Sequence, residues 1–347
     1  MKILEINTEP SWRGGERQTY LNMLGFRELG LDVELLAKHG GTLAQKSANA
    51  DFQTHAIQSR WEGLKFLIRN GKNYDILHAQ TSKAQLLAVL SKPFHQRPVV
   101  YSRRVNFKIS GFFTKLKYHF TDKVVAITNE VRKNIENFGV KNVSVITDVV
   151  EIQNINKPRA KDFILKNNWQ NKKIIATVAA FTEEKDPKTL VKSIAHLKTL
   201  RNDFVFLHFG EGKLKESSLQ IVNDLKINEV YQFVGYHEDI QDFYSVFDVF
   251  VLTSQQEGLG SSILDAFIQR VPVVATRAGG ITETVENQGI LCDIGNAVQI
   301  AEGLHRLLND QELRDNFTQK AYQTVTTKHS NQRIAEAYFK VFTELLS

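Results

Sequence analysis

The residues best suited to chemistry lie in the stretch EGLGSSILDAF, which runs from Glu257 to Phe267. Two glycines and two serines follow the glutamate, and Asp265 comes two helical turns later. A glycine-rich turn that leads into a helix presents free backbone N–H groups and the positive end of the helix dipole, an arrangement that binds phosphate. A phosphate site alone needs no acids. The two carboxylates therefore predict recognition of hydroxyl groups, as on a sugar and a ribose.

A strand and a helix are predicted on either side of this turn. The run VFVL at residues 249–252 has the length and composition of a buried strand in a parallel sheet. From Ile263 onward, the apolar residues suit a helix packed against that sheet. The turn is thus expected where a buried strand ends and a helix begins.

The same alternation runs along the whole chain. Strands are predicted at residues 2–7, 33–37, 75–79, 99–102, 124–128, 143–146, 173–179, 205–209, 231–234, 249–252, 271–275 and 289–292. Helices are predicted at residues 16–29, 61–69, 83–90, 112–120, 130–138, 187–200, 214–225, 239–245, after residue 263 and in the C-terminal tail. Such repeats specify parallel, doubly wound sheets, because each parallel return needs a crossover helix.

The polar stretch 151–159, which contains Pro158, divides the alternation into two series and is predicted to be a linker. We therefore expect an α/β protein with two Rossmann-like domains that face each other across a cleft, at residues 1–157 and 158–330. Ligands of open α/β sheets bind at the carboxyl ends of the strands, so the cleft is expected to hold the chemistry.

Composition limits the classes of protein. At 347 residues the chain is too long for one typical core, and its apolar runs are too short to span a bilayer. The single cysteine, Cys292, excludes an intramolecular disulfide and any cysteine-rich metal site, and the ten histidines show no zinc-binding spacing. Met1 leads into a strand rather than a signal peptide. These features predict a soluble protein of a reduced compartment, the cytoplasm.

Charge is divided unevenly between the two halves. Residues 1–160 carry 24 Lys and Arg against 14 Asp and Glu, a net charge of +10, whereas residues 161–347 carry 20 against 24, a net charge of −4. The basic half predicts an anionic partner, which the charge alone leaves open among a membrane leaflet, a phosphorylated lipid and nucleic acid.

The most basic part of that half, residues 102–120, interleaves lysines and arginines with aromatic residues. An ordinary helix with a buried aromatic face and a solvated basic face explains this pattern. An interfacial segment that contacts anionic lipid head groups explains it equally well. The sequence leaves both interpretations open.

EGLGSSILDAF and the following VPVVATRAGGITETV closely resemble the donor-binding signature of family-four glycosyltransferases, which have the GT-B fold and retain the anomeric configuration. The resemblance extends to GEG at 210–212, FVGY at 233–236, residues 243–254 and, near the N-terminus, Gly14-Gly15-Glu16. It implies transfer of a sugar from a UDP- or GDP-linked donor to a glycan or lipid-linked acceptor in bacterial surface polysaccharide synthesis. It also implies that the helix at 331–347 packs back towards the N-terminal domain.

The resemblance implies three catalytic residues, Glu257, Lys185 and Arg103. Glu257 would lie beside the donor sugar hydroxyls, and Lys185 would contact the diphosphate. Ala180 stands where the family has a second phosphate-binding cation, and Arg103-Arg104 stand where the family has a histidine. Arg103 either replaces the charge missing at Ala180 or binds an anionic acceptor, and the sequence does not separate the two.

The donor-binding residues that the resemblance implies are Gly14, Gly15, Gly210, Gly258, Leu259, Gly260, Ser261, Ser262 and Asp265. Gly14-Gly15 is expected in a loop after the first strand, where glycine lets the backbone approach the diphosphate. Asp265 replaces a longer glutamate that holds the ribose in the family. No cofactor, metal or nucleic acid is expected, because the chain has no DxD-like triplet and the family needs no metal.

Simpler explanations remain for single residues. Gly14-Gly15 fits a tight turn, Lys185 a solvated surface lysine, and His78 a strand-end histidine whose hydrogen bonds are satisfied. Two other functions also remain open. A sugar-nucleotide epimerase of related fold would need acids and a histidine at the sugar ring. A non-catalytic binding protein would tolerate the changes at Ala180, Arg103 and Asp265.

Overall fold

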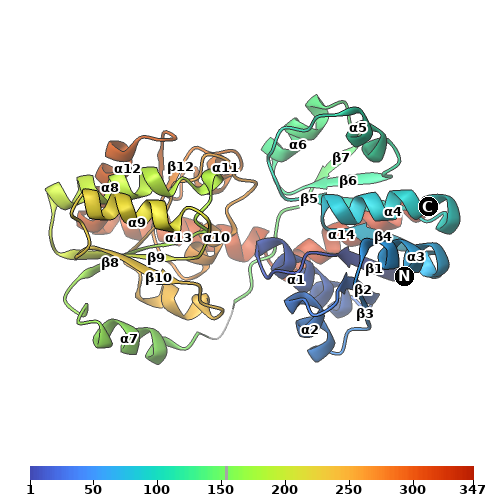
Figure 1. Cartoon of the computed structure of the whole chain (residues 1–347), viewed down its shortest axis with the longest axis horizontal. Coiled ribbons are helices and arrows are strands. Elements are labelled where there is room, and N and C mark those ends of the chain that lie inside the picture. Colours follow the sequence, from blue (N-terminus) through green and yellow to red (C-terminus); the bar gives the residue numbers. More distant parts are fainter. Residues whose placement is uncertain (153–154) are drawn as a thin grey trace. The chain divides into compact units, whose positions relative to one another are not determined.

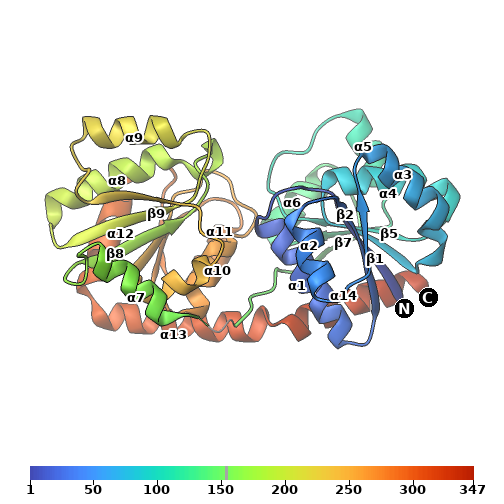
Figure 2. The same cartoon turned by 60° about the horizontal axis from the view of Figure 1, so that its bottom comes forward.

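The computed structural model describes residues 1–152 and 155–347, which form two compact units (Figure 1). Unit 1 consists of Met1–Glu151 and Lys328–Ser347, and unit 2 of Ile152–Thr327. Each unit has its own parallel sheet covered by helices (Figure 2). The prediction of an α/β protein with two doubly wound parallel sheets is confirmed.

Unit 1 has a seven-stranded sheet of order β3-β2-β1-β4-β5-β6-β7. Its strands are β1 Lys2–Asn7, β2 Asp32–Lys38, β3 Thr54–Ile57, β4 Ile76–Ala79, β5 Val99–Arg103, β6 Lys123–Ala126 and β7 Val143–Val145. Its helices are α1 Gly14–Glu28, α2 Thr42–Asn49, α3 Arg60–Asn70, the 3-10 helix η1 Gly71–Asn73, α4 Ser82–His95, α5 Phe112–His119, α6 Asn129–Asn137 and α14 Asn331–Leu346.

Unit 2 has a six-stranded sheet of order β10-β9-β8-β11-β12-β13. Its strands are β8 Lys173–Val178, β9 Phe204–Phe209, β10 Tyr231–Gly235, β11 Val249–Leu252, β12 Val273–Thr276 and β13 Ile290–Cys292. Its helices are α7 Lys157–Lys166, η2 Glu183–Lys185, α8 Pro187–Leu200, α9 Lys215–Asp224, η3 Ile240–Val246, α10 Ser261–Ile268, α11 Ile281–Val285, α12 Ala297–Asn309 and α13 Gln311–Lys328.

The boundaries differ from the predicted ones. The units divide after Glu151 and after Thr327 rather than after residues 157 and 330. Part of the predicted linker is helical, because Asn156 caps α7 by accepting a hydrogen bond from the backbone N–H of Arg159 at 3.2 Å and Pro158 suits the first turn of a helix. Residues 153 and 154 of that linker lie outside the described residues.

The elements α2, β3 and α11 and the 3-10 helices η1 and η2 were not predicted, and the predicted helix at 239–245 is the 3-10 helix η3. Of the four residues of β3, only Ile57 is fully buried, so the strand lacks the continuous apolar run by which the others are recognised. It forms because β2 offers it a free edge, with Leu35 to Lys38 pairing with Thr54 to Ile57.

Strand order reverses once in each sheet. In unit 1 the chain adds strands outward from β1 in one direction and from β4 in the other, and in unit 2 it does so from β8 and β11. At such a point the crossover helices leave on opposite faces, so the loops after the two central strands diverge and leave room for a ligand. Each unit therefore presents one ligand-binding edge, after β1 and β4 or after β8 and β11.

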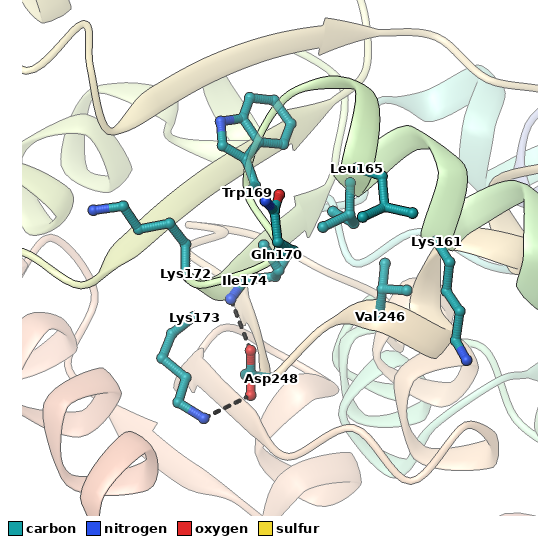
Figure 3. A pocket seen from close by; sticks show the side chains of 10 residues that line it. Lys161, Leu165, Trp169, Gln170, Lys172, Lys173, Ile174, Val246 and Asp248 are labelled. Carbon is teal, nitrogen blue, oxygen red and sulfur yellow. Dashed lines mark hydrogen bonds and ion pairs between the residues drawn. The ribbon is translucent and has the colours of Figure 1, made fainter.

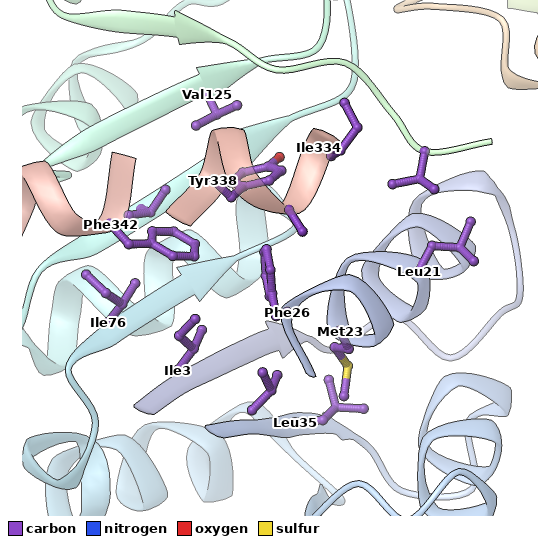
Figure 4. Close-up of a cluster of buried hydrophobic side chains, with 14 of the residues drawn as sticks. Ile3, Leu21, Met23, Phe26, Leu35, Ile76, Val125, Ile334, Tyr338 and Phe342 are labelled. Carbon is purple, nitrogen blue, oxygen red and sulfur yellow. The ribbon is translucent and has the colours of Figure 1, made fainter. Parts of the chain in front are cut away.

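The core of unit 1 incorporates the C-terminal helix (Figure 4). Tyr338 and Phe342 of α14 are buried, and both rings contact Phe26 of α1 edge-on, with centroids 5.7 Å and 5.5 Å apart. The apolar stripe of α14 thus completes the hydrophobic layer between α1 and the sheet. The C-terminal helix belongs to unit 1, although more than 170 residues of unit 2 precede it.

A chain of buried polar groups also ties α14 to the sheet. The hydroxyl of Tyr338 lies 2.8 Å from Ser102 Oγ, which lies 2.8 Å from His78 Nε2, and His78 Nδ1 lies 2.6 Å from Glu5 Oε1. Glu5, His78 and Ser102 are completely buried, and burial raises the pKa of Tyr338 to about 12. Each polar group has a partner, so the network costs little to bury and favours one position of α14.

Replacing Phe342 by alanine should lower the free energy of unfolding of unit 1 by about 3–5 kcal/mol, because it removes a fully buried ring from contact with Phe26 and Tyr338. Phe339 is the matched control on the same helix, since 41% of it is exposed and Phe339→Ala should cost less than about 1 kcal/mol. Urea denaturation of both variants measures the difference. Equal losses would contradict the role of α14 in this core.

Candidate functional site

Two of the predicted catalytic residues contact each other at the point where the strand order of unit 2 reverses. Lys185 ends η2 in the loop after β8, and Glu257 lies in the loop after β11. The ammonium of Lys185 forms an ion pair with Glu257 Oε2, and Ser254 Oγ lies 3.4 Å from the same oxygen. Both side chains are about one-fifth exposed. The pair is therefore partly desolvated yet open to a ligand.

Hydrogen bonds join the loops that carry this pair. The backbone N–H of Gln255 donates to Glu184 O at 2.8 Å, and the hydroxyl of Thr253 donates to Lys185 O at 3.1 Å. On the other side, the backbone N–H of Gly280 donates to Glu257 O at 3.1 Å. These bonds hold the loops after β8, β11 and β12 in a fixed relation. The two charged groups are thus positioned before any ligand binds.

The predicted glycine-rich turn leads directly into α10. Gly260 caps the helix with φ +83°, and a Cβ at this position would lie 3.0 Å from Ile263 Cδ1. Glycine tolerates this left-handed conformation without strain. Gly258, Leu259 and Gly260 are buried, whereas Ser261 and Ser262 at the start of α10 are half-buried. The turn aims the N-terminal end of α10 towards the loop edge that holds Glu257.

Gly210 lets the loops after β8 and β9 approach closely. It adopts φ +148°, and a Cβ there would lie 2.0 Å from Ala179 O. No side chain fits that space, so the position requires glycine. Its backbone N–H donates to Gly235 O at 2.9 Å. Gly210 therefore brings the ends of β8, β9 and β10 together beside the Lys185 loop.

His208 is a supporting residue that the sequence did not reveal. Its Nε2–H donates to Ala179 O at 3.1 Å, and its Nδ1 accepts from the hydroxyl of Tyr231 at 2.8 Å. Its ring stacks on Phe181 with centroids 3.8 Å apart. Burial lowers the pKa of His208 to about 3, because the charged form is penalised. A neutral histidine thus fixes the backbone next to Ala180. The one sequence feature that could have predicted this role is the position of His208 within the buried strand β9.

Asp265 lies one turn into α10 and is half-buried. Gln241 donates to its Oδ2 at 3.3 Å. In unit 2 the structure therefore places Lys185, Glu257, the glycine-rich turn and Asp265 on the loops and helix that follow β8 and β11. The ion pair between Lys185 and Glu257 was not predicted, because the sequence assigned the two residues to different parts of a ligand.

Gly14 and Gly15 are the first two residues of α1, so the predicted loop at these positions is wrong. The helix begins at Gly14 rather than at the predicted residue 16. The reason is a capping box, in which Glu16 Oε2 accepts from the backbone N–H of Arg13 at 3.0 Å. Burial raises the pKa of Glu16. The glycines follow β1, one of the two strands where the order of this sheet reverses. A Cβ on Gly15 would meet no atom within 4 Å.

Arg103 ends β5 and is 7% exposed. Its guanidinium donates to the hydroxyl of Tyr118 at 3.2 Å and to Phe107 O, and its Nε has no partner among residues 1–152 and 155–347. Arg103 thus supports the loop between β5 and α5 in unit 1, and its predicted catalytic role stays a prediction. His78 is fully buried with hydrogen bonds to Glu5 and Ser102, as expected for a satisfied strand-end histidine.

Arg104 is bound inside unit 1 as well. Its Nε donates to Asp148 Oδ1 at 2.9 Å, and its guanidinium also contacts Gln80 Oε1. The charge of Asp148 raises the pKa of Arg104 although burial opposes it. Since Gln80 in turn donates to Glu5 at 2.6 Å, Arg104 extends the buried polar network described above.

A shallow pocket of about 460 Å³ lies at the other edge of the second sheet (Figure 3). It is lined by α7 and by the residues that start β8 and precede β11, among them Trp169, Lys173 and Asp248. Asp248 accepts from the backbone N–H of Ile174 at 2.8 Å and pairs with Lys173 at 3.3 Å. Both carboxylate oxygens of Asp248 are thus satisfied internally, and the pocket lies where β8 and β11 begin, away from their carboxyl ends. The ligand edge is the one with Lys185 and Glu257.

Among the described residues, no three His, Cys, Asp or Glu side chains cluster in a way that could hold a metal ion. None of the helices described is both long and apolar enough to cross a bilayer.

Comparison with known proteins identifies the family. Residues 160–324 match the family described as glycosyl transferases group 1, and residues 12–153 match glycosyltransferase family 4. The chain belongs to the family-four glycosyltransferases. A lipopolysaccharide core biosynthesis glycosyltransferase, LpsE of Rhizobium meliloti, is 27% identical over 243 residues, which cover 68% of this chain and 69% of LpsE. About two thirds of this glycosyltransferase thus aligns with a relative named as a lipopolysaccharide core enzyme.

Two further comparisons concern a lipid-linked substrate and the fold. A Campylobacter jejuni enzyme named N-acetylgalactosamine-N,N'-diacetylbacillosaminyl-diphospho-undecaprenol 4-alpha-N-acetylgalactosaminyltransferase is 22% identical, covering 74% of this glycosyltransferase and 70% of that enzyme. The crystal structure of Anabaena HepE in complex with UDP and glucose matches with a TM-score of 0.88 and 17% identity, covering 99% of this chain and 100% of HepE. The latter establishes the GT-B fold.

The buried His208 should make unit 2 of the glycosyltransferase sensitive to acid. The unfolded histidine takes up a proton near pH 6.5, whereas the folded one resists protonation until about pH 3. The unfolded state therefore binds more protons between these values. The stability contributed by keeping His208 neutral is complete above pH 6.5 and is lost as the pH falls towards 3, with a magnitude of about 5 kcal/mol.

His208→Gln keeps a donor for Ala179 but cannot be protonated. Its free energy of unfolding, measured in urea at pH 4 and pH 7, should depend less on pH than that of the parent. His305→Gln in the same unit is the control, because His305 is half-buried on α12. An unchanged pH dependence in His208→Gln would show that His208 is not the buried neutral group.

Proposed function

We propose that this glycosyltransferase moves a sugar from a UDP-linked donor to an acceptor of a bacterial surface polysaccharide, with retention of configuration and without a metal or other cofactor. The observation that carries the proposal is the Lys185–Glu257 pair beside the glycine-rich start of α10, at the strand reversal of unit 2. Support for the donor comes from HepE, which binds UDP and glucose, and support for the acceptor comes from LpsE.

Unit 2 would bind the nucleotide sugar and unit 1 the acceptor. The diphosphate would lie at the N-terminal end of α10, where backbone N–H groups and the helix dipole favour negative charge. Lys185 adds a full positive charge at the same edge. Because negative charge grows on the diphosphate as the glycosidic bond breaks, these groups would stabilise the transition state more than the ground state. In other transferases a divalent ion stabilises this charge, and here these groups would do so instead.

Glu257 has the geometry to orient the sugar while it remains bound to Lys185. Both of its described side-chain contacts involve Oε2, which leaves Oε1 to accept from a sugar hydroxyl. An incoming diphosphate would share Lys185 with Glu257 and so link the sugar and phosphate subsites. In a retaining transfer of this type the acceptor attacks from the face of the leaving group, and the departing phosphate takes its proton. No side-chain base is then needed.

An epimerase would need a histidine at the sugar ring. His208, beside the loop after β8, is buried, stacked on Phe181 and hydrogen-bonded at both nitrogens. This arrangement argues against that alternative and favours transfer to an acceptor. A glycan or a lipid-linked sugar fits the proposal, the latter by analogy with the Campylobacter enzyme. We place the reaction in the cytoplasm, at the inner face of the membrane when the acceptor is lipid-linked.

A panel of nucleoside diphosphates and nucleotide sugars tests the donor. UDP-sugars should raise the melting temperature in a concentration-dependent way, because a ligand that binds only the folded state stabilises it. GDP-sugars are the comparison. A rise with GDP-sugars alone would overturn the choice of UDP, and binding without turnover on any acceptor would favour a non-catalytic binding protein.

Substitution of the pair should separate its two roles. Glu257→Gln should lower turnover strongly without weakening UDP binding, because the carboxylate acts on the sugar and its neutralisation leaves Lys185 free for the diphosphate. Lys185→Ala should lower both UDP affinity and turnover, since a charge-assisted contact to the diphosphate contributes about 1.5–3 kcal/mol. Calorimetry with UDP and a rate assay with the UDP-sugar measure the two effects.

Matched controls lie close by in unit 2. Lys188 is exposed on α8, three residues beyond Lys185, and Glu286 is exposed after α11. Lys188→Ala and Glu286→Gln should leave both affinity and turnover at the parental level. Full turnover in Glu257→Gln, or parental UDP affinity in Lys185→Ala, would refute the role given to that residue.

A further inference from the structure

Helices α4 and α5 of unit 1 each leave an apolar stripe uncovered. On α4 the exposed residues are Leu86, Leu90 and Phe94, at 43%, 53% and 61% exposure. On α5 and just beyond its end they are Phe112, Phe113, Leu116 and Phe120, at 76%, 84%, 43% and 46% exposure. In each helix three of these residues recur every four positions, which places them on one face. Two helices thus expose aromatic and aliphatic side chains that a soluble surface normally hides.

The two stripes belong to one surface, because α4 and α5 contact each other (Figure 2). Lys117 donates to Ser82 Oγ at 2.6 Å, and Gln85 donates to the hydroxyl of Thr121 at 2.9 Å. Lys92 donates to Phe120 O at 3.0 Å. We call the exposed residues of α4 and α5, from Leu86 to Phe94 and from Phe112 to Phe120, the α4–α5 face.

Positive charge surrounds this face. Residues 76–121, which contain β4, α4, β5 and α5, include eight Lys and Arg but no Asp or Glu. Acids elsewhere in unit 1 pair with three of the eight, through Lys83–Glu9, Lys92–Asp122 and Arg104–Asp148. Lys108 and Lys115 are exposed and have no acidic partner among the described residues. The surface therefore keeps a net positive charge beside its apolar stripes.

We propose that the α4–α5 face docks the enzyme on an anionic membrane surface. Aromatic side chains that protrude from a short helix, next to lysines, suit the boundary between head groups and acyl chains. Lysines near an anionic leaflet add electrostatic attraction. The basic aromatic segment thereby acts as an interfacial segment rather than as a helix with a buried aromatic face, since Tyr118 is the buried ring of α5 while Phe112 and Phe113 point outward.

A second copy of the chain fits this face less well. Two copies that met through the same face would bring their unpaired lysines together, and like charges repel at close range. An anionic bilayer supplies both the apolar depth and the opposite charge. The docking surface goes beyond the proposed transfer reaction and does not depend on it, since all of its residues lie in unit 1, outside the loops that carry Lys185 and Glu257. It would bring an enzyme with a lipid-linked acceptor to its substrate.

Vesicle co-sedimentation of the full chain tests the proposal. The protein should bind vesicles of phosphatidylcholine with phosphatidylglycerol, should bind pure phosphatidylcholine weakly, and should be released as salt rises, because screening shortens the reach of the charges from about 10 Å at 0.1 M to about 3 Å at 1 M. Phe112→Ser with Phe113→Ser should weaken binding by at least about ten-fold. Lys108→Glu with Lys115→Glu should weaken it by about 25-fold or more, taking about five-fold for each positive charge removed.

Matched controls change similar residues away from the face. Trp61→Ser removes a 74% exposed aromatic from α3, and Lys65→Glu with Lys141→Glu reverses two exposed lysines of unit 1. The controls should bind anionic vesicles within about two-fold of the parent. All variants should keep the melting temperature and the UDP-induced stabilisation of the parent, which separates failure of docking from failure of the donor site.

Equal binding to neutral and anionic vesicles would overturn the proposal. Parental binding in both α4–α5 variants would do so as well. The third contrary result is a chain that does not bind vesicles but is dimeric in light scattering and becomes monomeric on Phe112→Ser with Phe113→Ser, because the face would then be an interface between copies.

Discussion

Parallel pairing of β8 with β11 is the constraint on which the candidate site depends. These strands are neighbours in the sheet, yet β9 and β10 come between them in sequence, and the strand order reverses where they meet. Parallel strands end at the same edge, so Lys185 and Glu257 meet although 72 residues separate them. A close backbone approach at Gly210 and the left-handed conformation of Gly260 shape the loops there, and neither position accepts a side chain without strain. The ion pair is thus a product of topology.

Unit 1 depends on the packing of α14, a helix that follows the whole of unit 2 in the sequence. Apolar contacts of Tyr338 and Phe342 with Phe26 supply most of the driving force. The polar line from Tyr338 through Ser102 and His78 to Glu5 adds specificity, because a helix shifted by one turn would leave buried groups without partners. Arg104 and Asp148 extend this network to the end of the first chain segment. His78 is thus the satisfied strand-end histidine that the sequence suggested, and it serves the fold.

The two units also differ in how their charged residues are distributed. At the candidate site of unit 2 the charge of Lys185 is balanced by Glu257, and the positive end of the α10 dipole lies beside them. Unit 1 holds the basic excess, and much of it surrounds the exposed rings of α4 and α5. Arg103 belongs to neither group of charges, since it is buried and donates to the Tyr118 hydroxyl and Phe107 O. A cation in a sequence motif can therefore serve the fold as readily as a ligand.

By itself, the sequence determined the α/β class, the two sheets and the turn from Glu257 into α10, because buried parallel strands and glycine-rich helix starts have strong local patterns. Its family motifs led to the glycosyltransferase family. It did not reveal β3, whose residues lack a continuous apolar run, or the eight-residue helix α2, and it misplaced Gly14-Gly15 in a loop that the capping contact of Glu16 makes helical. Only the tertiary structure decided that Lys185 binds Glu257, that His208 is neutral and supports Ala179, and that Phe112 and Phe113 are exposed. Each of these depends on which distant segments become neighbours, and local residue patterns do not encode the burial that results.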